Sequence, residues 1–231
     1  MMNYLYKHII LIGSLLLISG CANMHADVKS GKEARQAGDY ETALNHLEPL
    51  VEFGDEEAKY ELAVALIRRP ESTSEDYQRA RNLLKEVRGK RHKNALFELG
   101  RLYHKGKTVR KNYKKAKEYY TASSELGYQR ANYELGNVLV DEKRFSEAEE
   151  VCKDAFYAQY YKAAMCLARL HEKGFGGSQN REKALAWYLV AERHDVSRAS
   201  KKVSELSARL NSKSISRANA LSIGLEENEE D

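Results

Sequence analysis

Proline is scarce in this chain, since only Pro49 and Pro70 occur among 231 residues. Because proline kinks or ends helices, its scarcity leaves long stretches free to be helical. The charged fraction of 31% and the fifteen tyrosines agree with one elongated helical domain. We therefore expect an all-α fold.

A surplus of one charge sign is also missing. The formal net charge is +4, and it falls to +3 if Lys7 leaves with the signal described next. The two signs alternate along the chain except at its acidic end. Nucleic-acid-binding proteins usually carry a clustered basic surface, so we expect no nucleic-acid partner.

Long apolar runs are absent apart from one short segment, from Ile9 to Ile18. A run of this length is too short to cross a hydrocarbon core of about 30 Å as a helix. It follows Lys7 and His8, a pattern typical of a removable export signal. Residues 1–20 are therefore predicted to be a signal peptide.

The end of this run, Leu17 to Cys21, resembles the bacterial lipoprotein signal called the lipobox. The resemblance implies cleavage before Cys21 and a diacylglycerol on its sulfur, and two or three acyl chains hold a protein at a membrane surface. Ala22, by the sorting rule of that class, implies the outer membrane. The alternative is an ordinary secretory signal that ends near a cysteine. We expect residues 21–28 to be a lipid-anchored tether.

Alanine recurs in two registers that are fifteen residues apart. Successive alanines of the first register are 37, 36, 32 and 36 residues apart, which is the period of stacked helical hairpins. We predict about five hairpins from residue 26 to 195 and a capping helix from Val196 to Leu210, together a repeat domain over residues 29–210. The first register is Ala43, Ala80, Ala116, Ala148 and Ala184, and the second is Ala58, Ala95, Ala131, Ala163 and Ala199.

Two stretches resemble SEL-one-like repeats, and others resemble tetratricopeptide repeats. Residues 95–127 and 163–195 carry the SEL-type features, while residues 131–159 and 38–44 have tetratricopeptide spacing and sequence. The resemblance implies a right-handed α-solenoid that serves as an interaction scaffold, and it says little about activity. The SEL-type features are Gly100, Gly106, Ala116 and Tyr120 in one stretch and Leu170, Gly174, Ala184 and Tyr188 in the other.

Resemblance to tetratricopeptide arrays also implies a binding groove along the first helix of each unit. Aromatic and guanidinium side chains are common at protein interfaces, so this groove suits an extended peptide or a loop of a partner. The alternative is that the same side chains only pack against the neighbouring helix. The implied column is Tyr60, Phe97, Tyr133 and Met165, flanked by Val64, Arg101, Asn137 and Arg169.

Signs of catalysis, cofactors or metals are missing. Gly100 and Gly106 are separated by five residues where a phosphate loop needs four, and the segment is predicted as a helix that runs into a link. The seven histidines lack the spacing of a zinc site, and no Gly-x-Ser-x-Gly elbow occurs. We expect no enzyme, no cofactor, no metal and no small-molecule substrate.

Cys152 and Cys166 lie symmetrically about a predicted turn near Gln159, and disulfides persist outside the cytosol. A bond requires Cα atoms within about 7 Å. Against the bond, Cys166 falls in a column that otherwise holds Glu61, Glu98 and Glu134 and looks solvated, while Cys152 lies in a core column. The sequence leaves both states open and favours two free thiols.

Residues 211–231 depart from the repeat pattern and end in an acidic run from Glu226 to Asp231. We expect a disordered tail there.

These features favour a non-catalytic scaffold that is lipid-anchored at the periplasmic face of the outer membrane and positions other envelope proteins. Similar lipoproteins support exopolysaccharide export, for example of alginate. A virulence or signalling adaptor that binds a soluble peptide or host protein is the first alternative, and the inner membrane or the cell surface is an alternative location. A cell-wall hydrolase is disfavoured, because cysteine-rich relatives of that kind carry a cysteine pair in every unit.

Overall fold

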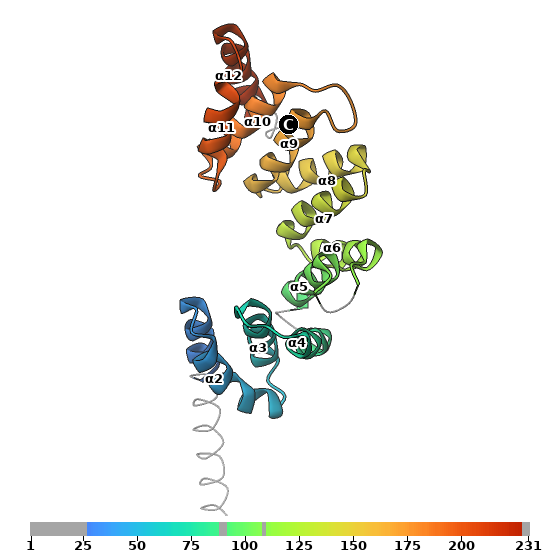
Figure 1. Cartoon of the computed structure of the whole chain (residues 1–231), viewed down its shortest axis with the longest axis vertical. Helices are drawn as coiled ribbons and strands as arrows, with labels where there is room; N and C mark the ends of the chain where they lie inside the picture. Colours follow the sequence, from blue (N-terminus) through green and yellow to red (C-terminus); the bar gives the residue numbers. More distant parts are fainter. Residues whose placement is uncertain (1–26, 88–91, 108–109, 228–231) are drawn as a thin grey trace, which may run out of the picture. The chain divides into compact units, whose positions relative to one another are not determined.

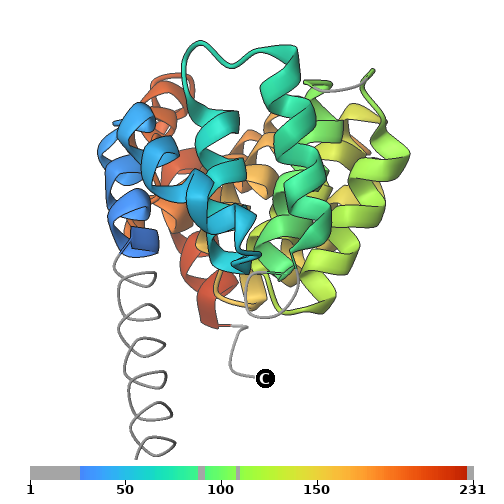
Figure 2. The same ribbon diagram turned by 90° about the horizontal axis from the view of Figure 1, so that it is seen from below.

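The computed structural model describes residues 27–87, 92–107 and 110–227 (Figure 1). Within these ranges every long element is an α-helix and there is no strand, as the second view also shows (Figure 2). The prediction of an all-α fold is confirmed.

The helices belong to two compact units, Met1–Arg110 and Lys111–Asp231. Unit 1 contains a helix over residues 27–37, followed by α2 (Tyr40–Glu52), α3 (Glu56–Arg68), α4 (Ser74–Glu86) and α5 (His92–Lys105). Unit 2 contains α6 (Tyr113–Glu125), α7 (Gln129–Asp141), α8 (Phe145–Tyr157), the 3-10 turn η2 (Tyr161–Ala163), α9 (Ala164–Lys173), α10 (Arg181–Arg193), α11 (Ala199–Ser207) and α12 (Ser212–Glu227).

Successive helices pack on one another within each unit. The alanines of both registers lie where these helices meet, because all ten are no more than 1% exposed. A methyl side chain at these points lets two helices approach closely, and the apolar residues around it form the core. The register spacing therefore identified the packing positions correctly.

Short polar links end one helix and start the next. The side chains of Asp39, Asp55 and Thr73 accept hydrogen bonds from the first turns of α2, α3 and α4, and such N-caps each contribute about 1 kcal/mol. Gly174 ends α9 with φ 68°, and a Cβ there would lie 2.8 Å from the backbone nitrogen of Gln179. Glycine is therefore required in the longer link between α9 and α10.

The C-terminal segment was predicted to be disordered from residue 211, and this was wrong over Ser212–Glu227, which form α12. This helix packs against α10. Its contact face includes small residues, among them Ala218 and Ser222, which are 0% and 1% exposed, beside the larger Ile215 and Leu225. A serine-rich sequence looks solvated, yet small side chains allow close helix packing. The repeat array thus continues past the predicted capping helix, of which α11 forms the central part.

The predicted signal peptide, Cys21 and residues 22–26 of the tether lie outside the described residues. The last two tether positions are already helical, and Val28 is 5% exposed. Among the residues that the structure describes, no helix combines the length and the apolar character needed to span a bilayer.

Candidate partner-binding faces

In unit 1 the predicted groove column belongs largely to the core. Phe97 and Val64 are each 1% exposed, so they are closed to direct contact with a partner. Tyr60 and Arg101 are partly exposed, and Arg101 lies over Phe97 with its Cζ 5.9 Å from the ring centroid. For Phe97 the groove prediction was wrong and the packing alternative holds, because the side chain two residues past the alanine points into the core.

Two carboxylates are buried in unit 1 and paired with arginine. Glu61, 1% exposed, accepts a hydrogen bond of 2.7 Å from Nε of Arg35. Glu98, 3% exposed, accepts one of 2.8 Å from Nη1 of Arg101 and lies 3.6 Å from Nη2 of Arg68. A buried charge is tolerated only when it is paired. The glutamate column, predicted to be solvated, is therefore an internal part of unit 1.

A pocket beside Glu98 gathers four cationic side chains and one aromatic ring. Its volume is about 80 Å³, well below the roughly 300 Å³ of a small-molecule site. Within its lining, Lys107 Nζ lies 5.6 Å from the centroid of Tyr77. We therefore assign this region a structural role. The pocket is lined by Ile67, Arg68, Tyr77, Glu98, Arg101, Leu102, Lys105 and Lys107.

In unit 2 the corresponding column reaches the surface. Tyr133 and Met165 are partly exposed. The ring of Tyr133 lies 5.9 Å from that of Tyr160, centroid to centroid, and Lys162 Nζ lies 5.3 Å from the Tyr133 centroid. Burial raises the pKa of Tyr160 to about 12, so its phenol stays protonated near neutral pH.

Tyr160 and Lys162 were missed from the sequence. A signal for the first was present, since Tyr160 lies three residues before Ala163, just as Tyr128 lies three residues before Ala131. An aromatic residue thus recurs three positions before the alanine in two successive repeats. Lys162 carried no such signal, because only the structure shows that its ammonium lies over Tyr133.

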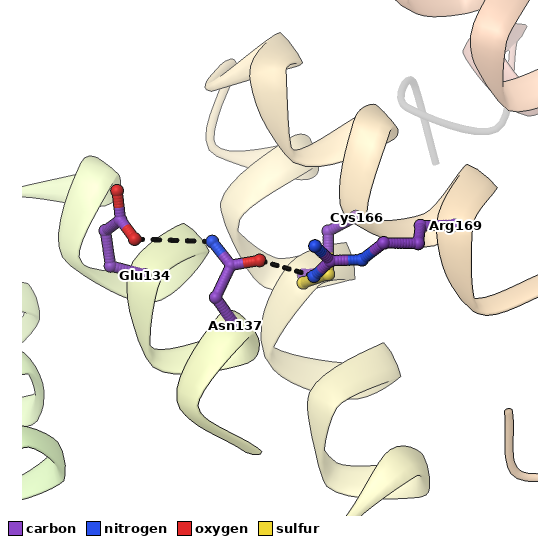
Figure 3. Close-up of a disulfide and its surroundings, with 5 residues drawn as sticks. Glu134, Asn137, Cys166 and Arg169 are labelled. Carbon is purple, nitrogen blue, oxygen red and sulfur yellow. Dashed lines mark hydrogen bonds between the residues drawn. A yellow bond between two sulfur atoms is a disulfide. The ribbon is translucent and has the colours of Figure 1, made fainter. Parts of the chain in front are cut away.

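The flanking residues Asn137 and Arg169 are brought together in unit 2 (Figure 3). Asn137 Nδ2 donates to Oε2 of Glu134 at 3.3 Å, and Nη2 of Arg169 donates to Oδ1 of Asn137 at 2.5 Å. The Nε of Arg169 is buried and makes no hydrogen bond within the described part of the chain. The amide thus connects α7 to α9 and holds one guanidinium edge in place, while one donor of that guanidinium remains unsatisfied.

A tyrosine near Arg169 is held by a carboxylate on α9. The hydroxyl of Tyr188 donates to Oε2 of Glu172 at 2.6 Å. Burial, and then this hydrogen bond to an anion, raise the pKa of Tyr188 well above its usual value. The phenol is therefore a permanent donor that orients Glu172.

A disulfide lies beneath this polar line and joins Cys152 of α8 to Cys166 of α9 (Figure 3). Their Cα atoms are 6.3 Å apart, and the two residues are 0% and 1% exposed. The preference for free thiols was wrong, because the column of Cys166 is buried where it was thought to be solvated. A Cβ on Gly136 of α7 would lie 2.4 Å from the sulfur of Cys152, so the bond also requires a glycine opposite it.

Chemistry of other kinds finds little support. In the described ranges no cluster of three or more histidine, cysteine or acidic side chains is suited to hold a metal ion. Helix α5 runs to Lys105 and is followed by Gly106 at φ 69°, which is a helix entering a link, as predicted for the segment with phosphate-loop-like glycines.

A model of the Sel1 repeat matches residues 93–128 and 158–195. Among solved structures, the crystal structure of a Sel1 repeat protein from Oxalobacter formigenes is similar, with a TM-score of 0.59 and 16% identity over 77% of this chain and 74% of that one. The crystal structure of c5321, a protective antigen present in uropathogenic Escherichia coli strains and displaying an SLR fold, has a TM-score of 0.44 and 17% identity over 87% of this chain and 56% of that one. No curated protein sequence matches.

The two matched segments include both stretches that resemble SEL-one-like repeats in the sequence. The Oxalobacter protein supports the same fold by its structure. Sel1 repeats generally act as modules that bind other proteins. The chain therefore has an α-solenoid repeat fold, in which residues 93–128 and 158–195 match the Sel1 repeat.

Proposed function

We propose that this protein is a non-catalytic scaffold, lipid-anchored at the periplasmic face of the outer membrane, which holds another envelope protein through unit 2. The binding surface is the tyrosine face, defined as Tyr133, Tyr160, Lys162, Asn137 and Arg169. The observation that carries this assignment is the fixed placement of these side chains on α7, η2 and α9 together with their preceding link.

The tyrosine face suits an extended segment with exposed carbonyl or carboxylate oxygens. Tyr133 and Tyr160 offer apolar rings that lose little conformational entropy on binding. Lys162 adds a cation above the Tyr133 ring, and Arg169, which is partly exposed, adds a guanidinium group. Because Asn137 already orients the guanidinium, a bound oxygen would gain a charge-assisted hydrogen bond with little ordering cost.

Location and client class rest on the sequence. The Leu17 to Cys21 segment resembles a lipobox, and lipoproteins of similar repeat composition assist exopolysaccharide export. An export complex is therefore the first client class to test. A soluble host protein or peptide is the competing outcome.

Crosslinking in intact membranes tests the tyrosine face. Chains with Tyr133→Ala, Lys162→Ala and Arg169→Ala should lose a reproducible crosslink to an envelope protein, identified by mass spectrometry. A matched control removes the same three residue types elsewhere on unit 2, through Tyr157, Lys114 and Arg181. Equal crosslinking by both triple variants, at unchanged helicity, would place the binding surface elsewhere. If the crosslinked proteins belong to the division, flagellar or secretion machinery, the partner is of that class and is not part of an export complex.

The anchor is tested separately through Cys21→Ser. The substituted chain should leave the membrane fraction and appear in the periplasmic extract, because the acyl chains can no longer be attached. Labelling with a radioactive or clickable fatty acid should be lost in parallel. Retention of the substituted chain in membranes, with full function, would overturn the lipid-anchor proposal.

A further inference from the structure

A small pocket lies in unit 2 where side chains of α8, α9, α10 and α12 converge. Its volume is about 140 Å³, which is less than the roughly 300 Å³ of a small-molecule site. A cavity of about 150 Å³ nevertheless accommodates a group as large as benzene. The pocket is therefore large enough for one short apolar side chain.

The floor of this pocket is apolar. Ala186 and Trp187 of α10 are 0% and 3% exposed, and Leu221 and Leu225 of α12 complete the apolar lining. An apolar group that enters the pocket is removed from water against these side chains, which is favourable. The deep part of the pocket thus selects an apolar group.

The rim of the pocket is charged and carries one cation in excess. Glu149 and Lys153 of α8 form an ion pair of 2.8 Å, with side chains that are 35% and 44% exposed. Lys183, in the first turn of α10, is exposed and forms no ion pair with any residue that the structure describes. Its attraction to Glu149 is weaker than that of Lys153, which also donates a hydrogen bond to that carboxylate.

The partly buried ring of His171 also lines the pocket, and it makes no hydrogen bond within the described part of the chain. Burial lowers the pKa of His171; Lys183 and Lys153 lower it further, whereas Glu149 raises it. The imidazole is therefore neutral near neutral pH. Its ring nitrogens can donate to or accept from a group bound at the rim.

Charge and depth together select the group that fits. A single excess cation matches a monoanion, and Glu149 disfavours a doubly charged group, because the hydrogen bond from Lys153 holds the pKa of Glu149 below its usual value. An acidic side chain would have to bring its carboxylate to the apolar floor first, which is costly. In a C-terminal residue the side chain and the carboxylate branch from one carbon, so the first can fill the floor while the second stays at the rim.

We propose that this pocket binds the C-terminal residue of a partner chain, with an apolar side chain against Trp187 and the carboxylate beside Lys183 and His171. The pocket would give unit 2 a second recognition site. The inference is independent of the tyrosine face and of the lipid anchor.

Fluorescence of Trp187 tests the site directly, because this residue is the only tryptophan of the chain and lies at the floor of the pocket. The chain without the predicted signal peptide, carrying Cys21→Ser to prevent lipidation, keeps every described residue. The peptide acetyl-Ala-Ala-Leu with a free carboxylate should change the fluorescence and reach saturation. The same peptide with a C-terminal amide should bind at least about tenfold more weakly. Isocaproate, which has the same side chain and carboxylate but no peptide chain, should also bind more weakly.

Variants of the rim give signed outcomes with the free-carboxylate peptide. Lys183→Gln should weaken binding about tenfold, whereas Lys183→Arg should retain most of it. Lys213→Gln is the matched control, because Lys213 is exposed on α12 and does not line the pocket. Glu149→Gln should strengthen binding, since it releases Lys153 and removes a repulsive charge. Far-UV circular dichroism should show unchanged helicity in all four.

The pH profile separates a binding role of His171 from a structural one. A bound carboxylate favours the protonated ring, so binding should strengthen as pH falls until the carboxylate of the peptide is itself protonated below about pH 4. His171→Gln should remove this dependence. A pH profile that is the same with and without His171 would contradict its assigned role.

Three results would overturn the proposal as a whole. These are equal affinity for the carboxylate and amide peptides, unchanged affinity in Lys183→Gln, and isocaproate binding as tight as that of the peptide, which would indicate a site for free acids. The triple variant of the tyrosine face retains every residue of the pocket. It should therefore bind the peptide normally, so that the two sites fail or succeed separately.

Discussion

Three residues after the second-register alanine, unit 1 places Glu61 and Glu98, whereas unit 2 places Glu134 and Cys166. In unit 1 these positions hold buried carboxylates that are neutralised by arginines. In unit 2 Glu134 is only partly buried and binds a neutral amide, and Cys166 forms a disulfide.

The difference teaches how one repeat position serves two purposes. In unit 1 the arginine side chains pair with buried carboxylates, and the neighbouring Phe97 is buried in the core. In unit 2 a covalent bond replaces the ion pair between helices, so Arg169 and Tyr133 stay available at the surface. The same repeat spacing can therefore carry a structural face or a recognition face, depending on which chemistry holds the helices together.

The largest effect is expected from Glu61→Ala. It leaves Arg35, whose side chain is 10% exposed, buried without a partner, and such losses cost about 3–5 kcal/mol. Glu134→Ala, the matched change in unit 2, should cost less than about 1 kcal/mol because a partly exposed amide contact is lost. Urea unfolding followed by circular dichroism measures both. Similar losses of unfolding free energy in the two variants would contradict the contrast between the two units.

Removal of the disulfide should follow in size. Cys152→Ala with Cys166→Ala should lower stability by about 3 kcal/mol, the value for a closed loop of about 15 residues. A reductant should lower the stability of the parent chain and leave that of the double variant unchanged. Thiol counting on denatured chain that carries Cys21→Ser should give no free thiol until reductant is added.

A smaller loss is expected from Gly136→Ala. The added methyl group would press on the sulfur of Cys152, and overpacking of this kind costs about 1–3 kcal/mol. Gly224→Ala is the matched change in another helix, where the added Cβ would meet no described atom within 4 Å, and it should stabilise the chain by up to about 1 kcal/mol. If the bulk of the sulfur causes the loss, Cys152→Ala should relieve it, and a double-mutant cycle would measure the coupling.

The smallest effect concerns alkaline pH. Because the pKa of Tyr160 is about 12 in the folded chain and that of an ordinary tyrosine is 10.0, the unfolded chain loses this proton first. The stabilisation is complete below pH 10 and is lost as pH rises toward about 12. Tyr160→Phe should flatten this part of the stability curve, with Tyr157→Phe as control. An unchanged slope would mean that the Tyr160 environment is as wet as bulk solvent.

The fold followed from the sequence because one small residue per helix had to recur at every contact. The two alanine registers marked ten buried positions that the structure confirms. Helix α12 escaped notice because Ser214, Ser222 and Ala218 make its buried face look solvated. It also forms ion pairs with α10 between residues 33 and 35 positions apart, and such pairs leave no local pattern.

The tyrosine face was predictable only in part. Its members Tyr133, Asn137 and Arg169 were proposed from repeat position, together with Met165 outside the face, and the structure leaves all four partly exposed. Phe97 has the same repeat position as Tyr133 and is buried. The position along the helix fixes the direction of a side chain, whereas its exposure depends on contacts with other helices that the repeat period does not encode.

The bond between Cys152 and Cys166 also has a mechanical consequence. A protein held at one end and pulled at the other loses its helices one after another as tension rises. The sulfur bridge withholds the segment between the two cysteines, fourteen positions apart, from extension. At about 3.5 Å per residue, the disulfide shortens the fully extended chain by close to 50 Å. Helices α8 and α9 therefore stay linked while the neighbouring helices unfold.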